Sequence, residues 1–226
     1  MSVLTMFGLS LLLTAPVETG LTVAAQPAPL HGTLLTPEGQ VRAAALILPG
    51  SGPTDRDGNN PLGVAAGTYR KLAEGLAAQG IATVRFDKRG VAQSAAAASN
   101  EADFTFDDNI TDARLWIDET LATAEDDDPR LGGLVLLSGA GRKAGDVLRE
   151  QLASAPLPPD LRTAAETALS ELEAGRTTEA PPQLAALFRP SVQPYMISWL
   201  ALDPAVLAAA YHGPMMVAQG STDLQT

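Results

Sequence analysis

Two short polar segments of this sequence carry residues suited to acyl-transfer chemistry. Ser51 stands between two glycines after the apolar run 43–48, and Asp223 follows the apolar run 214–219. A glycine-flanked residue lets a backbone N–H approach a developing oxyanion, and a carboxylate can orient a histidine in a Ser-His-Asp set. The simpler alternatives are a plain tight turn at Ser51 and a helix N-cap or a solvated position at Asp223.

The pattern of apolar residues predicts the elements that must position these segments. Residues 21–23 and 30–35 are predicted to form an opening hairpin, and further strands are predicted at 43–48, 81–86, 134–137 and 214–219. Amphipathic helices are predicted at 69–79 and 107–124, while residues 143–210 show helical periodicity broken by prolines. This alternation indicates an α/β fold with a mainly parallel sheet, helices on both faces and a helical cap.

The same pattern divides the chain into four segments. They are an apolar N-terminal segment, the N-terminal part of the core, a helical cap, and a core strand that ends at the acid residue: 1–20, 21–142, 143–210 and 211–226. If residues 1–25 are a signal peptide, the protein is periplasmic or secreted, and otherwise it is cytoplasmic. The apolar run at the N-terminus is too short to span a bilayer as a helix, so no stable membrane span is expected.

Charge and composition exclude several classes of function. The net charge is −11, with 26 acidic and 15 basic side chains and no basic stripe, so nucleic acid is not expected as a partner. The sequence has no cysteine, which excludes a disulfide framework, a thiolate nucleophile and cysteine metal ligands. No cofactor and no metal ion are expected, and the oligomeric state stays open.

Four segments, in the right order, resemble a bacterial branch of the α/β-hydrolase superfamily that is described as serine-aminopeptidase-like or acyl-CoA-thioester-hydrolase-like. They are the loop around Ser51, the turn that begins at Asp87, a cap segment and the final segment: 46–59, 81–94, 187–194 and 219–225. The second is similar to the superfamily's D-x-R-G-x-G-x-S turn, with Ala92 in place of the second glycine. We interpret Asp87 and Arg89 of that turn as structural residues whose charges are satisfied internally.

The resemblance implies a function and two site residues. It implies a serine hydrolase lineage that acts on ester, thioester or peptide bonds of a small acyl or peptide substrate. By the same resemblance, Ser51 supplies an oxyanion N–H from its backbone, and Asp223 is the triad acid.

The sequence departs from that family where the nucleophile should lie. No serine has glycine at both −2 and +2, so the G-x-S-x-G elbow is missing, and residues 125–133 stand where its strand belongs. Three residues follow Asp223, where the triad histidine should come, while His212 precedes the last strand and is expected at the wrong end of the sheet. We therefore expect a chain that lacks the nucleophile strand and the C-terminal His element and is inactive as it stands. The alternative is a non-catalytic hydrolase-like protein that binds a small ligand.

The missing strand also leads to an expectation about pairing. The strands at 81–86 and 134–137 should pair directly in a shortened sheet, because an open slot would leave backbone groups unpaired. Apolar helix faces that have lost their partners should then stay exposed.

Three weaker alternatives concern other segments. Ser138 ends the strand at 134–137 and would occupy the nucleophile position, but Leu136 at −2 is too large for a sharp elbow. Residues 139–144 match the nucleotide-binding pattern G-x-G-x-x-A but lack the acidic residue at the end of a following strand. Residues 55–59 superficially suggest a calcium loop, although the spacing and the closing Glu are absent.

Overall fold

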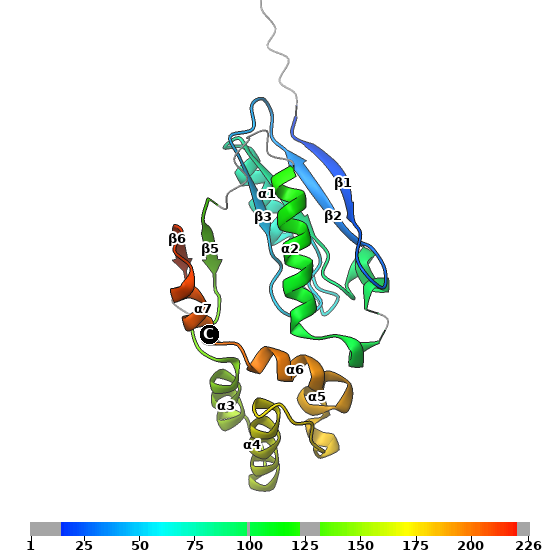
Figure 1. The fold of residues 1–226 in the computed structure, drawn as a ribbon, viewed down its shortest axis with the longest axis vertical. Helices are drawn as coiled ribbons and strands as arrows, with labels where there is room; N and C mark the ends of the chain where they lie inside the picture. Colours follow the sequence, from blue (N-terminus) through cyan, green and yellow to red (C-terminus); the bar gives the residue numbers. More distant parts are fainter. Residues whose placement is uncertain (1–14, 99, 123–131, 221–226) are drawn as a thin grey trace, which may run out of the picture. The chain divides into compact units, whose positions relative to one another are not determined.

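The computed structural model describes residues 15–98, 100–122 and 132–220 (Figure 1). The chain divides into two compact units, which are described separately. Unit 1 comprises residues 1–97 and 115–126, and unit 2 comprises residues 98–114 and 127–226. Each unit has its own strands and its own buried core.

Unit 1 is built on a four-stranded sheet whose order is β1-β2-β4-β3. Its strands are β1 (Val17–Val23), β2 (Leu30–Thr36), β3 (Ala43–Ile47) and β4 (Ile81–Phe86). β1 and β2 form the expected antiparallel hairpin, β2 pairs with β4 in antiparallel fashion, and only β3 and β4 are parallel. The sheet is therefore mixed, and the expectation of a mainly parallel sheet was wrong because the hairpin occupies one edge of β4.

The occupied edges of β4 also overturn the expected pairing of the strands at 81–86 and 134–137. A strand has two edges, and those of β4 are taken by β2 and β3. The strand at 134–137 lies in a different sheet. The fold is thus α/β with a mixed sheet and helices, and it does not form the shortened continuous sheet that we expected.

Helices cover the two faces of this sheet. The part of α2 (Phe106–Ala122) that belongs to unit 1 places Trp116 on the face that carries Val84 and Phe86, and the rings of Phe86 and Trp116 stack at 5.1 Å. Gly32 makes this contact possible, because a Cβ there would lie 2.6 Å from the Trp116 ring. The α1 helix (Thr68–Ala77) packs against the opposite face.

Unit 2 contains a short sheet of two parallel strands. They are β5 (Leu134–Leu137) and β6 (Met215–Ala218), with Leu134 opposite Met215 and Leu137 opposite Ala218. Their existence agrees with the apolar runs of the sequence. Several of their apolar side chains are more than half exposed, namely Val135, Leu137, Met216 and Val217.

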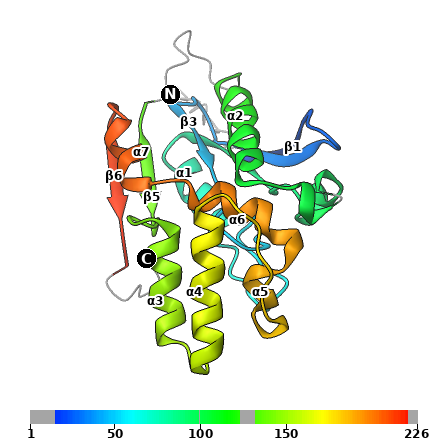
Figure 2. The same cartoon turned by 60° about the horizontal axis from the view of Figure 1, so that its bottom comes forward.

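The rest of unit 2 is helical. Residues 143–210, all of which the structure describes, contain no strand, as their periodicity predicts. The helices are α3 (Ala144–Ser154), α4 (Pro159–Glu173), α5 (Ala185–Phe188), α6 (Gln193–Leu200) and α7 (Pro204–Ala210). Figure 2 shows α3 and α4 side by side, and Leu148, Leu169 and Leu172 belong to the buried core of this unit. Within the described ranges, no helix is both long enough and apolar enough to cross a membrane.

Candidate functional site

The loop that follows β3 is held at both of its glycines. The N–H of Gly50 donates to the hydroxyl of Tyr69 on α1 at 2.9 Å. The ammonium group of Lys88, which follows β4, donates to the carbonyl of Gly52 at 2.6 Å and to the carbonyl of Gly50. Gly52 adopts a left-handed φ of 76°, which glycine tolerates without a steric penalty. The loop around Ser51 is therefore cross-linked to both neighbouring elements.

Ser51 itself is exposed, and its backbone N–H has no acceptor among the described residues. The Gly50 carbonyl and the Ser51 N–H belong to one peptide unit, and in a trans peptide they point in opposite directions. Because the carbonyl of Gly50 points to Lys88, the N–H of Ser51 points away from Lys88. This arrangement can donate a hydrogen bond to a ligand oxygen, which is what an oxyanion donor must do.

Lys88 is held in a partly desolvated position. Burial lowers the pKa of Lys88 from its usual 10.5 to about 8. Two carbonyl oxygens accept hydrogen bonds from the ammonium group there. Lys88 is a functional candidate that the sequence reasoning missed, because its contacts lie 36 and 38 residues away along the chain.

The segment 55–59 is a turn that binds its own backbone. Both the N–H of Asp57 and the N–H of Asn59 donate to one carboxylate oxygen of Asp55, at 2.9 and 2.8 Å. The carbonyl of Asp57 accepts the N–H of Tyr69 at 3.1 Å, which fastens the turn to the start of α1. Across the parts of the chain that the structure describes, no group of three acidic, His or Cys residues is arranged to hold a metal ion. The turn is therefore structural.

Asp87 is buried, and its carboxylate is fully engaged. One oxygen accepts the backbone N–H of Arg56 at 2.8 Å, and the other accepts the Arg56 guanidinium at 2.5 Å and the N–H of Gln93 at 3.1 Å. Arg89 donates to the carbonyls of Ala97 and Gln26. These bonds confirm the interpretation of Asp87 and Arg89 as structural residues.

A second buried charge, Arg85, lies near the carboxyl end of β4 and pairs with acidic side chains of β1 and of the loop after β3. Its side chain is 2% exposed and donates to Asp57 at 3.0 Å and to Glu18. The Arg56 guanidinium also reaches the carbonyl of Gly32 on β2 at 2.8 Å. Sequence reasoning did not find these contacts, since nothing in the local pattern indicates which loop an arginine will reach.

Asp223, the expected triad acid, lies outside the described residues, and β6 ends at Ala218. The structure therefore does not place it. The register of β5 and β6 puts His212 three residues before Met215, at the Leu134 end of the pair. That is the amino end of the strands, as expected. His31 lies on β2, where its ring contacts the Thr22 hydroxyl at 3.3 Å.

Ser138 has an unusual backbone conformation. It follows β5, is exposed, and has a φ of 50°, which non-glycine residues rarely adopt. Its N–H donates to the carbonyl of Ala218 at 2.9 Å. Strained backbone is a feature of nucleophile elbows, but five residues separate Ser138 from the start of α3 at Ala144. His212 lies at the other end of the strand pair, so it does not supply a base there.

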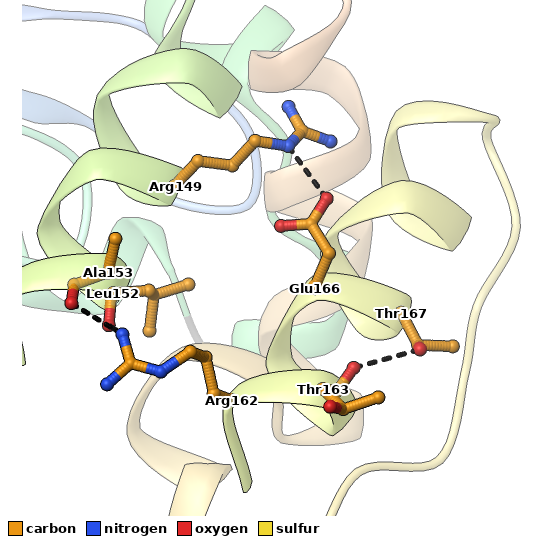
Figure 3. A pocket seen from close by; sticks show the side chains of 7 residues that line it. All are labelled: Arg149, Leu152, Ala153, Arg162, Thr163, Glu166 and Thr167. Carbon is orange, nitrogen blue, oxygen red and sulfur yellow. Dashed lines mark hydrogen bonds and ion pairs between the residues drawn. The ribbon is translucent and has the colours of Figure 1, made fainter. Parts of the chain in front are cut away.

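Polar side chains of α3 and α4 line a hollow in unit 2. Its volume is about 370 Å³, and Figure 3 shows the side chains that line it. Arg149 in its wall pairs with Glu166 at 2.9 Å, and Arg162 donates to the carbonyls of Leu152 and Ala153 at the end of α3. Both arginines of the hollow thus make hydrogen bonds within unit 2.

The segment 139–144 does not continue as a nucleotide-binding unit. It leads into α3, and α4 follows α3 where the nucleotide-binding pattern requires a strand. The basic side chains of this segment pair within unit 2, Arg142 with Glu150 at 2.6 Å and Lys143 with Asp203 at 3.8 Å.

Comparison with known proteins gives similarity of fold at low identity. No family model matches the sequence, and no curated protein sequence matches it. An α/β hydrolase from Penicillium has 16% identity and a TM-score of 0.45, with 90% of each chain covered. A thermophilic esterase from Thermogutta terrifontis has 16% identity and a TM-score of 0.46, over 90% of this chain and 80% of that one. A proline iminopeptidase-related protein from Thermus thermophilus has 19% identity and a TM-score of 0.43, over 90% and 89%.

Proposed function

We propose that this chain is of the serine hydrolase lineage and that its loop around Ser51 is an oxyanion loop for a small acyl or peptide ligand. The observation that carries the proposal is the Ser51 N–H. It belongs to an exposed residue, has no acceptor among the described residues and lies after β3, next to the carboxyl end of the parallel strand β4. The bond that such a lineage acts on is of the ester, thioester or peptide type.

We further propose that the chain as it stands binds such a ligand without turning it over. The support is the absence of any serine with glycine at both −2 and +2. An oxyanion donor without a nucleophile binds a carbonyl or carboxylate oxygen but forms no acyl-enzyme. The second candidate is an active hydrolase that uses Ser138, and the observation in its favour is the φ of 50° at that residue.

Binding at the loop can be tested by titrating ¹⁵N-labelled protein with sodium butyrate and with butyramide, its neutral counterpart. We expect a saturable shift of the Ser51 amide signal with both compounds. Amide signals of α4 serve as an internal control and should not move. Equal shifts at Ser51 and across α4, or none at Ser51, would contradict the proposal.

A further inference from the structure

We propose that Lys88 is a positioning residue for the oxyanion loop, because its ammonium group holds the Gly50 and Gly52 carbonyls and thereby aims the Ser51 N–H at the ligand. This inference rests on the proposed function of the loop. The first support is the pair of contacts itself, which joins the turn after β4 to the loop after β3.

The second support is the geometry of the peptide units. The carbonyl of Gly50 shares its peptide with the Ser51 N–H, so a clamp on the carbonyl orients the N–H. The carbonyl of Gly52 shares its peptide with Pro53, which has no N–H. The clamp at Gly52 therefore steadies the loop without presenting a second donor, and the effect falls on Ser51 alone.

The third support is the distribution of the other ties. The N–H of Gly50 donates to the hydroxyl of Tyr69 on α1. Among the described residues, the hydrogen bond that Ser51 itself makes is a long one, from the Thr54 hydroxyl to the Ser51 carbonyl at 3.4 Å. Without Lys88, the Gly50–Ser51 peptide could turn over about its flanking bonds. This rotation takes place about ψ of Gly50 and φ of Ser51, and the missing side chain of Gly50 makes the first of these torsions easy to change.

Orientation can be measured directly on the full chain. Residual dipolar couplings of the Ser51 N–H should change in Lys88→Met, while those of β4 stay the same. Lys88→Arg keeps a cationic donor and should retain the wild-type coupling. Lys71→Met, which removes an exposed lysine of α1, is the matched control for the loss of one positive charge.

Ligand binding provides the second measurement. With butyrate as the probe, Lys88→Met should raise the apparent Kd about two- to tenfold, the effect of one misdirected hydrogen bond. Unchanged Ser51 couplings together with an unchanged Kd in Lys88→Met would overturn the proposal. A different result is that butyrate fails to shift the Ser51 amide signal of the wild type while Lys88→Met still changes the dipolar coupling of the Ser51 N–H. That result would support the role of Lys88 and contradict the proposed function.

A pH titration of the wild type decides the matter if Lys88→Met does not fold. Deprotonation of Lys88 weakens the clamp, so the Ser51 amide signal should shift with a midpoint near pH 8, the pKa that burial gives this lysine. The charged or titratable groups of the loop after β3, of the turn after β4 and of α1 are Asp55, Arg56, Asp57, Asp87, Arg89, Tyr69, Arg70, Lys71 and Glu74. Tyr69→Phe controls for the hydroxyl bonded to the loop. A Ser51 signal that is constant between pH 7 and 9.5 would overturn the proposal.

Discussion

The carboxyl ends of β3 and β4 in unit 1 and those of β5 and β6 in unit 2 are built in contrasting ways. In unit 1, Lys88, Arg56 and Asp87 tie the loops together, and the Asp87 carboxylate that pairs with Arg56 is buried. In unit 2, each strand has four residues, and their apolar side chains lie largely exposed. Two strands alone are marginally stable in water. The comparison teaches that two neighbouring strand ends can be joined in different ways: among the described residues, side chains cross-link the loops of the first region, whereas a backbone bond from the Ser138 N–H to the Ala218 carbonyl joins the strand ends of the second.

Removing the Arg56 side chain should cause the largest change, a loss in the free energy of unfolding of unit 1. Arg56→Met leaves the Asp87 carboxylate buried without its cation, and breaking such a pair costs about 3–5 kcal/mol. Urea unfolding of the full chain, followed by the fluorescence of its two tryptophans, measures the loss. An exposed pair provides the contrast, since Arg176→Met separates Arg176 from Glu171 on the surface and should leave stability unchanged. Equal losses in the two variants would refute the cross-linking account.

The second-largest effect should be a difference in amide hydrogen-exchange rates between the sheet of unit 1 and the sheet of unit 2. The amides of Val84 and Arg85 in β4 lie between two paired strands, whereas those of β5 and β6 belong to a two-stranded sheet with open edges among the described strands. We expect the β5 and β6 amides to exchange about a hundredfold faster or more, a gap of roughly 3 kcal/mol in opening free energy. Equal protection in both sheets would mean that something covers β5 and β6.

The pH dependence of stability should show the smallest effect. The pKa of Lys88 is about 8 in the folded chain and 10.5 when it is solvated, so the unfolded state binds more protons between these values. The contribution of Lys88 to the free energy of unfolding should therefore rise as the pH increases from 8 to 10.5. Lys88→Met should lack this rise in a series of urea melts. A parallel pH profile for wild type and variant would show that Lys88 is not desolvated.

Much of the local structure could be predicted from the sequence, because each apolar run that we predicted to be a strand overlaps a strand of the structure. The run at 134–137 coincides with β5, and the helix expected at 107–124 is α2 within two residues at each end. Beyond the β1–β2 hairpin, strand pairing could not be predicted in this way. The edges of β4 are filled by β2 and β3, and no local pattern tells which strands will compete for an edge.

The candidate site was predicted in part. The glycines around Ser51 indicate a close-approach loop, because their chemistry is local. The Lys88 clamp and the bond from Arg56 to Asp87 join segments 31 to 38 residues apart, and such contacts depend on how the sheet brings its loops together. The φ of 50° at Ser138 was likewise not predicted, since serine rarely adopts it.

A fluorophosphonate probe tests the central claim most directly, namely that the chain keeps an oxyanion loop but has no nucleophile. Intact-mass measurement after incubation should show the unmodified chain, and p-nitrophenyl acetate should be hydrolysed at the buffer rate. Loss of triad members lowers turnover by about 10⁴- to 10⁶-fold, so residual activity would fall below detection. A stoichiometric adduct that maps to Ser138 and vanishes in Ser138→Ala would contradict the account.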